Sequence, residues 1–337
     1  MNSFVRANYR GAMVGGAVGD ALGAPVEFLS RPEILRLYGA EGISEFAEWT
    51  TGRGCVMRKG SYTDDTQMAL ATAVGMLGGL QGHRVGSVVD FVSAVYDRYL
   101  AWCALQDEPS QERWPGTTCL SALASGRMGY VDEPLNDRKG SGGIMRVAPV
   151  GLALQPYQAF ETGVEVAAIT HGHPTGYLAA GTFAEVVSRV VRGEELATAV
   201  GGARELLIGH DGSEETVDAL DLAVELFMID SDLDEAYRLL GEGWVAEEAL
   251  GIALFSGLSF PEDFAEGVLA AVNITGDSDT TGSLTGALLG AMLGYDSIPG
   301  DWARGVEDAK LLLDIADDLF AAFVEDAPLA PEKYPGP

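Results

Sequence analysis

Cysteine and histidine are scarce in this sequence, which has 3 cysteines and 4 histidines among 337 residues. Cys55, Cys103 and Cys119 are odd in number and irregularly spaced, so they indicate neither a disulfide framework nor a thiolate metal cluster. His171 and His173 share one short segment, but without further histidine or cysteine nearby they do not make a zinc site. These absences predict a protein of the reducing cytoplasm.

Basic residues and long apolar runs are also lacking. The 21 basic residues stand against 50 acidic ones, and the net charge of -29 disfavours nonspecific binding to nucleic-acid phosphates or anionic membranes. No window offers the roughly 18 uninterrupted apolar residues that a membrane span needs. The apolar stretch after Met1–Arg10 is rich in glycine and interrupted by Asp20, so no signal peptide is expected.

Apolar residues recur mainly at spacings of three and four, as in Met68, Ala71 and Val74, which is typical of helices. Strict alternation is short and rare, so no large sheet is expected. We therefore predict an all-α fold, a single compact helical bundle domain over 1–327, with a frayed tail at 328–337. The Gly- and Ala-rich stretch 282–294 predicts a close approach between helices. Further helices are expected at 164–169, 176–192, 195–208, 215–228, 233–240, 245–256, 262–273, 280–293 and 303–325.

The strongest local signal is Tyr62-Thr63-Asp64-Asp65-Thr66, which directly precedes an apolar helix. A structural interpretation exists, because threonine or aspartate at a helix start accepts hydrogen bonds from the free backbone donors, and acids there suit the helix dipole. Two carboxylates and two hydroxyls are nevertheless more oxygen than one cap needs. Asp64 and Asp65, being adjacent, point in different directions and suit two ions better than one.

A second cluster, Gly276 to Gly282, again precedes an apolar helix. Asp277 and Asp279 can chelate one ion and Thr280 can add its hydroxyl, and such oxygen ligands suit Mg²⁺, Mn²⁺ or Ca²⁺. The order also resembles an EF-hand loop beginning at Asp277. Position twelve of that loop is Leu288, which cannot supply the bidentate carboxylate required there, so the EF-hand interpretation fails.

At this point the sequence resembles the ADP-ribosylglycohydrolase family, whose best-known bacterial branch is the dinitrogenase reductase-activating glycohydrolases. Five motifs carry the resemblance in the family's order, namely Gly15 to Phe28, Tyr62 to Thr66, Gly140 to Arg146, Ile169 to Pro174, and Gly276 to Gly282. The resemblance implies an all-α fold with two Mg²⁺ or Mn²⁺ ions in a central cleft. By position, the implied metal ligands are Thr63, Asp64, Asp65, Asp277, Asp279 and Thr280. Glu27 matches a carboxylate near the metals, and Glu27 and Asp65 are the candidates for catalytic acid or base.

Several segments are candidates for substrate binding. Gly140, Ser141, Gly142 and Gly143 allow backbone donors to approach a diphosphate, although such a run alone is more often a flexible turn. Arg146 is expected either to neutralise phosphate or to satisfy nearby carboxylates. By resemblance, His171 lies near the ligand ribose, with a capping or core role as the alternative for either histidine. Trp244 to Glu248 is interpreted as the start of an amphipathic helix with a solvated charge pair, or as the adenine end.

Gly116 and Thr117 match a further family loop near the substrate. Trp114 stands where relatives close to the dinitrogenase reductase hydrolases carry an aspartate. This departure bears on the leaving group, because an aromatic ring at that place stacks on a base or leaving group, or closes the cleft.

Together these features predict a metal-dependent hydrolase that cleaves at C1″ of ADP-ribose and releases ADP-ribose from an ADP-ribosylated protein or other conjugate. Arginine is the first target to consider, with serine, O-acetyl-ADP-ribose and nucleic-acid ends as alternatives. Two rival functions remain open at this stage. One is a phosphatase of ADP-ribose derivatives, because a two-metal carboxylate site also suits in-line displacement. The other is an inactive ligand-binding or structural relative.

Overall fold

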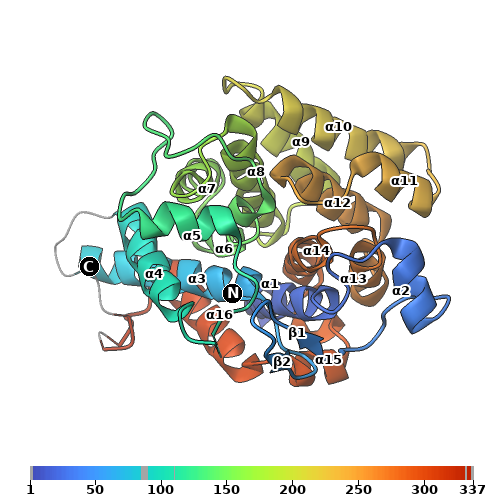
Figure 1. The fold of residues 1–337 in the computed structure, drawn as a ribbon. Coiled ribbons are helices and arrows are strands. Elements are labelled where there is room, and N and C mark those ends of the chain that lie inside the picture. Colours follow the sequence, from blue (N-terminus) through green and yellow to red (C-terminus); the bar gives the residue numbers. More distant parts are fainter. Residues whose placement is uncertain (1–2, 85–89, 110, 331, 335–337) are drawn as a thin grey trace.

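In the computed structural model, residues 3–84, 90–109, 111–330 and 332–334 are described, and helices make up nearly all of the regular structure (Figure 1). This confirms the prediction of an all-α fold. The strands of the described chain are β1 (Trp49–Thr50) and β2 (Val56–Met57), an antiparallel pair with Trp49 opposite Met57. The helices are α1 (Ser3–Gly23), α2 (Arg31–Tyr38), α3 (Asp64–Arg84), α4 (Phe91–Leu105), α5 (Thr117–Ala124), α6 (Ala148–Ala153), α7 (Gln158–Ala168), α8 (Pro174–Val190), α9 (Leu196–Leu207), α10 (Glu214–Met228), α11 (Leu233–Leu240), α12 (Ala246–Ser259), α13 (Phe264–Val272), α14 (Ser278–Leu293), α15 (Gly300–Gly305) and α16 (Ala309–Phe323), with short 3-10 turns at Ser141–Gly143 and Tyr295–Ser297.

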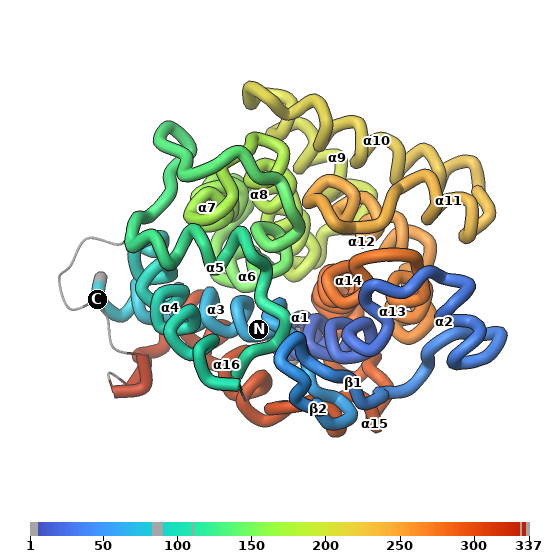
Figure 2. The backbone as a smooth tube through the Cα atoms, viewed as in Figure 1, coloured from blue at the N-terminus to red at the C-terminus, as the bar shows by residue number. Residues whose placement is uncertain are grey.

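Helices α1 and α14 pack against each other although they lie at opposite ends of the chain (Figure 2). Glycines line their contact, and a Cβ added to Gly11, Gly15 or Gly19 would lie 2.2, 2.4 or 1.9 Å from the carbonyl oxygen of Gly290, Gly286 or Gly282. The residue numbers of the contacting glycines rise along α1 as they fall along α14, so the two helices are antiparallel. The close approach expected of 282–294 is confirmed, and its partner is the glycine-rich N-terminal segment.

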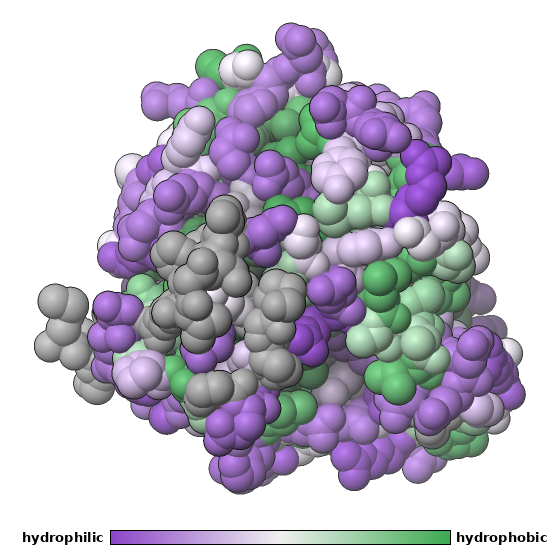
Figure 3. Space-filling model, turned by 90° about the vertical axis from the view of Figure 1, so that its left-hand side faces the viewer, coloured by the Kyte–Doolittle hydropathy of each residue, from purple (hydrophilic) through white to green (hydrophobic). Residues whose placement is uncertain are grey.

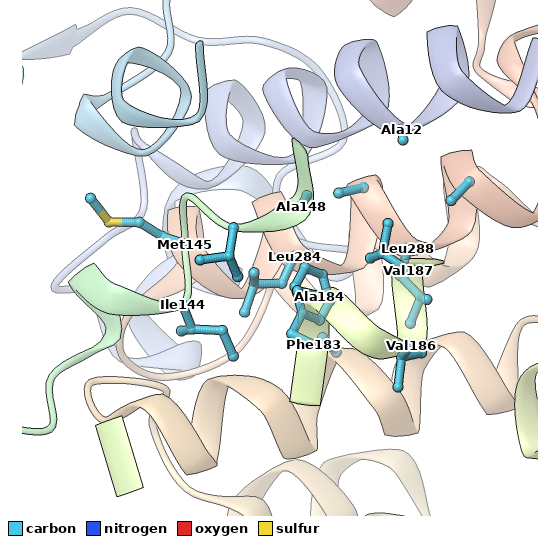
Figure 4. Packing of buried hydrophobic residues seen from close by; sticks show 14 of the residues in the cluster. Ala12, Ile144, Met145, Ala148, Phe183, Ala184, Val186, Val187, Leu284 and Leu288 are labelled. Carbon is cyan, nitrogen blue, oxygen red and sulfur yellow. The ribbon is translucent and has the colours of Figure 1, made fainter. Parts of the chain in front are cut away.

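Helix α8 lies at the centre of the core. Nearly all of its side chains are buried, from Thr175 to Val190. Figure 4 shows Phe183, Ala184 and Val187 of α8 beside Leu284 and Leu288 of α14. This packing holds the middle of α14 from the side opposite α1.

One predicted helix is wrong, because the stretch 303–325 is divided into α15 and α16. At the break, the Glu307 N–H donates to the Gly60 carbonyl oxygen at 2.8 Å. The Tyr62 hydroxyl donates to the Asp308 carboxylate at 2.9 Å, and Asp308 takes a left-handed backbone with φ 52°. These long-range hydrogen bonds interrupt a helix that the apolar periodicity alone would continue.

Two described residues of the C-terminal tail contact the body of the protein. Leu329 and Tyr334 are buried, and the Tyr334 hydroxyl donates to Asp318 on α16 at 2.6 Å. Residues 331 and 335–337 lie outside the described residues, and the frayed tail at 328–337 stays a prediction. Among the described helices, none combines the length and apolar character that crossing a membrane requires.

Candidate active site

Three segments bring carboxylates together at one place in the fold. Asp64 and Asp65 occupy the first turn of α3, Asp277 and Asp279 the start of α14, and Glu27 the turn that follows α1. Carboxyl oxygens of Glu27, Asp277 and Asp279 lie within 4.8 Å of one another. The four aspartates are buried and Glu27 is half-buried. We call these five residues the acidic centre.

The α1–α14 contact is one reason why the acidic centre forms. A Cβ on Gly23 would lie 2.4 Å from the Asp279 Cα, so only glycine allows the end of α1 to reach the start of α14. Asp20, three residues earlier on α1, is fully buried. Its carboxylate accepts the Thr63 N–H at 2.8 Å and the Thr66 N–H at 3.0 Å, and so ties the start of α3 to α1.

Asp20 is a functional residue to which the sequence reasoning assigned no role. Its signal is a single carboxylate inside the apolar, glycine-rich run Gly11–Gly23. Because a buried carboxylate is costly without donors, that isolated acid indicates a fixed hydrogen-bonding role. In the structure it caps the α3 helix from a distant part of the chain, which sequence spacing alone does not reveal.

Burial and mutual repulsion raise the pKa of every carboxyl in the acidic centre. Burial is the larger cause and the charge of Asp279 the next for Asp64, Asp65 and Glu27, whose pKa values stand well above the ordinary ones. Burial likewise raises the pKa of Asp277, and that of Asp279 with the charge of Asp277 second. Such a group of acids is unfavourable as bare charges and calls for a compensating positive charge.

The unpaired oxygens of the acidic centre fit a hard divalent cation. Glu27 Oε2, Asp65 Oδ2 and Asp279 Oδ1 are buried without a hydrogen-bond partner. Thr63 and Thr280, both buried, add hydroxyl oxygens beside Asp279 and Asp277, respectively. Carboxylate and hydroxyl oxygens are the ligands that Mg²⁺ and Mn²⁺ take. The structure thus brings the six predicted metal ligands together, with Glu27 beside them, and their binding of metal stays a prediction.

The predicted glycine loop lies beside the acidic centre. The Ser141 hydroxyl donates to Asp277 Oδ2 at 2.7 Å, and the Ser141 N–H donates to the Trp244 carbonyl oxygen at 3.1 Å. The loop packs on His171, since a Cβ on Gly142 or Gly140 would lie 3.1 or 3.6 Å from the imidazole ring. The run Gly140–Gly143 is therefore held in place by hydrogen bonds to Asp277 and Trp244 and by packing on His171.

His171 is buried, and its Nδ1 shares a hydrogen bond with the Thr170 hydroxyl at 2.9 Å. Burial, and then the charge of Arg146, lower the pKa of His171 to about 3, so the ring is neutral at pH 7. His173 is the N-terminal cap of α8, with its Nδ1 accepting the Thr175 N–H at 3.2 Å. The two histidines thus play different parts, and His171 is the one beside the glycine loop.

Arg146 does not face the acidic centre. Its fully buried guanidinium donates to the Thr170 hydroxyl at 2.7 Å and to the Val166 carbonyl oxygen at 3.2 Å, and lies 4.3 Å from the centre of the Tyr99 ring. Neither expectation for this residue fits the structure, because no carboxylate is among these partners and a phosphate cannot reach a fully buried group. Arg146 supports the His171 side of the site from within the core.

The charge pair expected to be solvated at 247–248 is another correction. Glu247 is buried and accepts a hydrogen bond from Lys139, which also donates to Glu215 at 2.6 Å. Glu248 accepts the Gly243 N–H at 3.1 Å. Both acids therefore hold the segments that carry Gly140 and Trp244.

Aromatic rings from four segments cluster next to the acidic centre. Phe28, which directly follows Glu27, stacks on Trp244 and meets Trp114 edge-on, with ring centres 5.2 Å apart in both pairs. Trp114 also packs on Trp49 at 5.2 Å. Phe28 and Trp114 have left-handed backbones, with φ of 68° and 60°. Strained aromatic residues beside a cluster of unpaired acids are typical of functional sites.

The loop Gly116–Thr117 lies on the exposed side of the acidic centre. Both residues are exposed, and the Gly116 N–H donates to Asp64 Oδ2 at 3.3 Å. Trp114 stands two residues earlier, so the aromatic cluster and this loop belong to one segment. The placement agrees with the expectation that residues 114–117 meet the substrate, an expectation that stays a prediction.

The ADP-ribosylglycohydrolase family matches residues 1–328. The chain is 28% identical over 296 residues to the ADP-ribosyl-[dinitrogen reductase] glycohydrolase of Rhodospirillum rubrum, covering 87% of each chain. It is 23% identical to the ADP-ribosylarginine hydrolase Tri1 of Serratia proteamaculans, covering 92% of this chain and 78% of the relative.

A solved structure described as an ADP-ribosylglycohydrolase-related protein complex has a TM-score of 0.70 and 26% identity, and the match covers 95% of this chain and 99% of that one. The fold, the five sequence motifs and these matches agree over the same residues. The chain therefore belongs to the ADP-ribosylglycohydrolase family and is a hydrolase of ADP-ribosyl bonds.

Proposed function

We propose that this protein uses two divalent cations to cleave the glycosidic bond at C1″ of ADP-ribose, releasing ADP-ribose from a modified target. The observation that carries the proposal is the acidic centre with its unpaired, buried oxygens on Glu27, Asp65 and Asp279. A family of ADP-ribosyl hydrolases supplies the substrate class. Arginine is the first linkage to test, because one relative is named as an ADP-ribosylarginine hydrolase, with serine, O-acetyl and nucleic-acid linkages next.

The cations are proposed to be Mg²⁺ or Mn²⁺, held by Thr63, Asp64, Asp65, Asp277, Asp279 and Thr280. Bound there, such ions orient substrate hydroxyls, lower the pKa of bound water and stabilise developing negative charge. The protein contributes rigidity to this arrangement. Asp20 fixes the start of α3, and Ser141 holds one oxygen of Asp277 through its hydroxyl.

Glu27 is our first candidate for the group that transfers a proton, and Asp65 the second. Both have an unpaired oxygen, but Glu27 is only half-buried and directly precedes the exposed Phe28, whereas Asp65 is 2% exposed. A proton that passes between substrate and solvent reaches Glu27 more easily. The glycine loop and His171 are proposed to contact the diphosphate and ribose, and the cytoplasm stays our prediction for the location.

The test is a panel of ADP-ribosylated arginine, serine and nucleic-acid substrates, assayed with Mg²⁺ and with Mn²⁺, with products identified by mass spectrometry. We expect free ADP-ribose from at least one substrate, and none after chelation of the metal. Asp64→Asn and Asp279→Asn should abolish turnover with the fold retained. Asp132→Asn, at an exposed acid outside the acidic centre, is the matched control and should change nothing.

Three results would contradict the proposal. Unaltered release of ADP-ribose by Asp64→Asn or Asp279→Asn would refute the metal assignment. Phosphate released from ADP-ribose 1″-phosphate, with no free ADP-ribose from any conjugate, would instead indicate the phosphatase function. A calorimetric titration that detects no binding of Mg²⁺ or Mn²⁺ to the wild type would remove the basis for both the glycohydrolase and the phosphatase function.

A further inference from the structure

A hollow lies between α4 and α5, outside the acidic centre. Its volume is about 540 Å³, within the range of about 300 to 1,000 Å³ that is usual for ligand pockets. Apolar side chains of both helices form much of its wall, among them Leu100, Ala104, Leu120 and Leu123. Figure 3, which views the side of the molecule where α4 lies, shows apolar side chains gathered between hydrophilic ones. We call this hollow the α4–α5 groove.

One charged group of the α4–α5 groove has an unfilled hydrogen-bonding position. Glu112 lines the groove, is 8% exposed, and uses Oε1 to accept the Trp114 N–H at 3.2 Å. Its Oε2 is buried and has no partner. A buried carboxylate oxygen without a donor is costly, so a ligand that brings a donor or a positive charge to Glu112 is favoured.

The segment 112–116 separates the groove from the acidic centre. Glu112 and Pro115 line the groove. On the other side, the Arg113 carbonyl oxygen accepts the Asp64 N–H at 3.1 Å, and the Gly116 N–H donates to Asp64 Oδ2 at 3.3 Å. Only the segment 112–116 therefore separates a molecule lying in the groove from Asp64.

We propose that the α4–α5 groove docks the polypeptide that carries the ADP-ribose, an inference that rests on the proposed function. An apolar side chain of the target lies on the wall formed by α4 and α5, and a basic side chain pairs with Glu112. The charge argues for a basic segment, because the protein carries -29 overall and Asp107 joins Glu112 in the lining. Arg53, the basic residue of the lining, is engaged with the Asp107 carbonyl oxygen at 3.0 Å.

The experiment compares a small substrate with a large one. The small substrate is the ADP-ribosylated amino acid, and the large ones are ten-residue peptides modified at the same amino acid and flanked by leucine with either arginine or glutamate. Ala104→Trp fills the groove from the exposed face of α4, and Glu112→Gln removes the charge while keeping an oxygen for the Trp114 N–H. Ala197→Trp, at an exposed alanine on α9, is the matched control.

We expect Ala104→Trp to raise KM for the arginine-flanked peptide about tenfold, the effect of losing one good interface anchor. Its kcat/KM for the ADP-ribosylated amino acid should stay within about twofold of the wild type. Glu112→Gln should remove the preference of the wild type for arginine-flanked over glutamate-flanked peptide. Ala197→Trp should behave as the wild type with all substrates.

The outcomes separate the docking inference from the proposed function. If the wild type releases ADP-ribose but Ala104→Trp and Glu112→Gln leave the peptide parameters unchanged, the groove does not dock the target. An equal loss on peptide and amino acid would also overturn the inference, because it would place the groove within the binding site of the small substrate. If the wild type releases no ADP-ribose from any substrate, the proposed function itself fails.

Discussion

Substituting Gly19 tests whether the close contact of α1 with α14 builds the acidic centre. In Gly19→Ala the new Cβ would lie 1.9 Å from the Gly282 carbonyl oxygen, against an ordinary contact distance of at least 3.4 Å, so the helices must separate by about 1.5 Å. The obstacle is backbone and cannot rotate away. Overpacking of this kind costs about 1–3 kcal/mol, and the upper end applies here. The better helix propensity of alanine returns about 0.5–1 kcal/mol, which leaves a net loss of about 2 kcal/mol.

Gly16→Ala is the matched control on the same helix. Its Cβ would lie 3.4 Å from the Ala287 Cβ and 3.5 Å from the Ser283 carbonyl oxygen, which are ordinary contacts. Here no clash offsets the higher helix propensity of alanine over glycine, so the free energy of unfolding should rise by about 0.5–1 kcal/mol. For a protein of this size 1 kcal/mol corresponds to about 2 °C in Tm. Calorimetry should therefore find Tm lowered by about 4 °C in Gly19→Ala and slightly raised in Gly16→Ala.

Activity gives the second measurement. Gly19 immediately precedes Asp20 on α1, and Asp279 stands near the start of α14, so a separation of the helices displaces the groups that position the acidic centre. A misplacement of about 1 Å costs a reaction on the order of a hundredfold. We expect kcat/KM of Gly19→Ala to fall by at least tenfold well below its Tm. A Gly19→Ala variant with wild-type Tm and kcat/KM would refute the view that the contact builds the site.

Three further predictions concern buried polar groups. Asp20→Asn should lower stability by about 2 kcal/mol and reduce kcat/KM, because an amide nitrogen cannot accept the Thr66 N–H; unchanged Tm and activity would contradict the proposed tie between α1 and α3. The pKa of His171 is lowered from 6.5 to about 3 by burial, so the unfolded chain binds the extra proton between these values and stability falls as the pH drops below 6.5. Between pH 7 and pH 5 the free energy of unfolding of the wild type should therefore fall by about 2 kcal/mol more than that of His171→Gln, as measured by urea unfolding. An equal fall in the two proteins would argue against a buried, neutral ring. Arg146→Lys should lower Tm by several degrees without changing KM, because an ammonium group cannot bond both Thr170 and Val166 while stacking on Tyr99; a raised KM at constant Tm would restore the phosphate-binding interpretation.

The two aspartate clusters were predictable because each is a local pattern. Oxygen-rich residues directly before an apolar periodic stretch indicate a helix start, and α3 and α14 begin at Asp64 and Ser278. The exclusion of an EF-hand needed only Leu288, one residue at a counted position. The resemblance of five motifs to those of one family then related segments far apart in the chain, which helical periodicity could not do.

Other features depended on contacts between distant segments. The break between α15 and α16 arises from hydrogen bonds to Gly60 and Tyr62, so the local periodicity gave a helix that was too long. Arg146 looked like a phosphate ligand because it follows the glycine loop, yet its direction is set by Thr170 and Tyr99. A short sequence pattern contains no information on which way such a side chain turns.

The sequence by itself determined the fold class, the family and the two oxygen-rich clusters at helix starts, because helical periodicity, motif order and the types of residues are properties of short stretches. Only the tertiary structure decided that Asp20 holds the start of α3 and that Phe28 meets Trp114 and Trp244. These contacts join positions far apart in the chain. The close packing of α1 on α14 is likewise a property of two helix surfaces together rather than of either sequence segment.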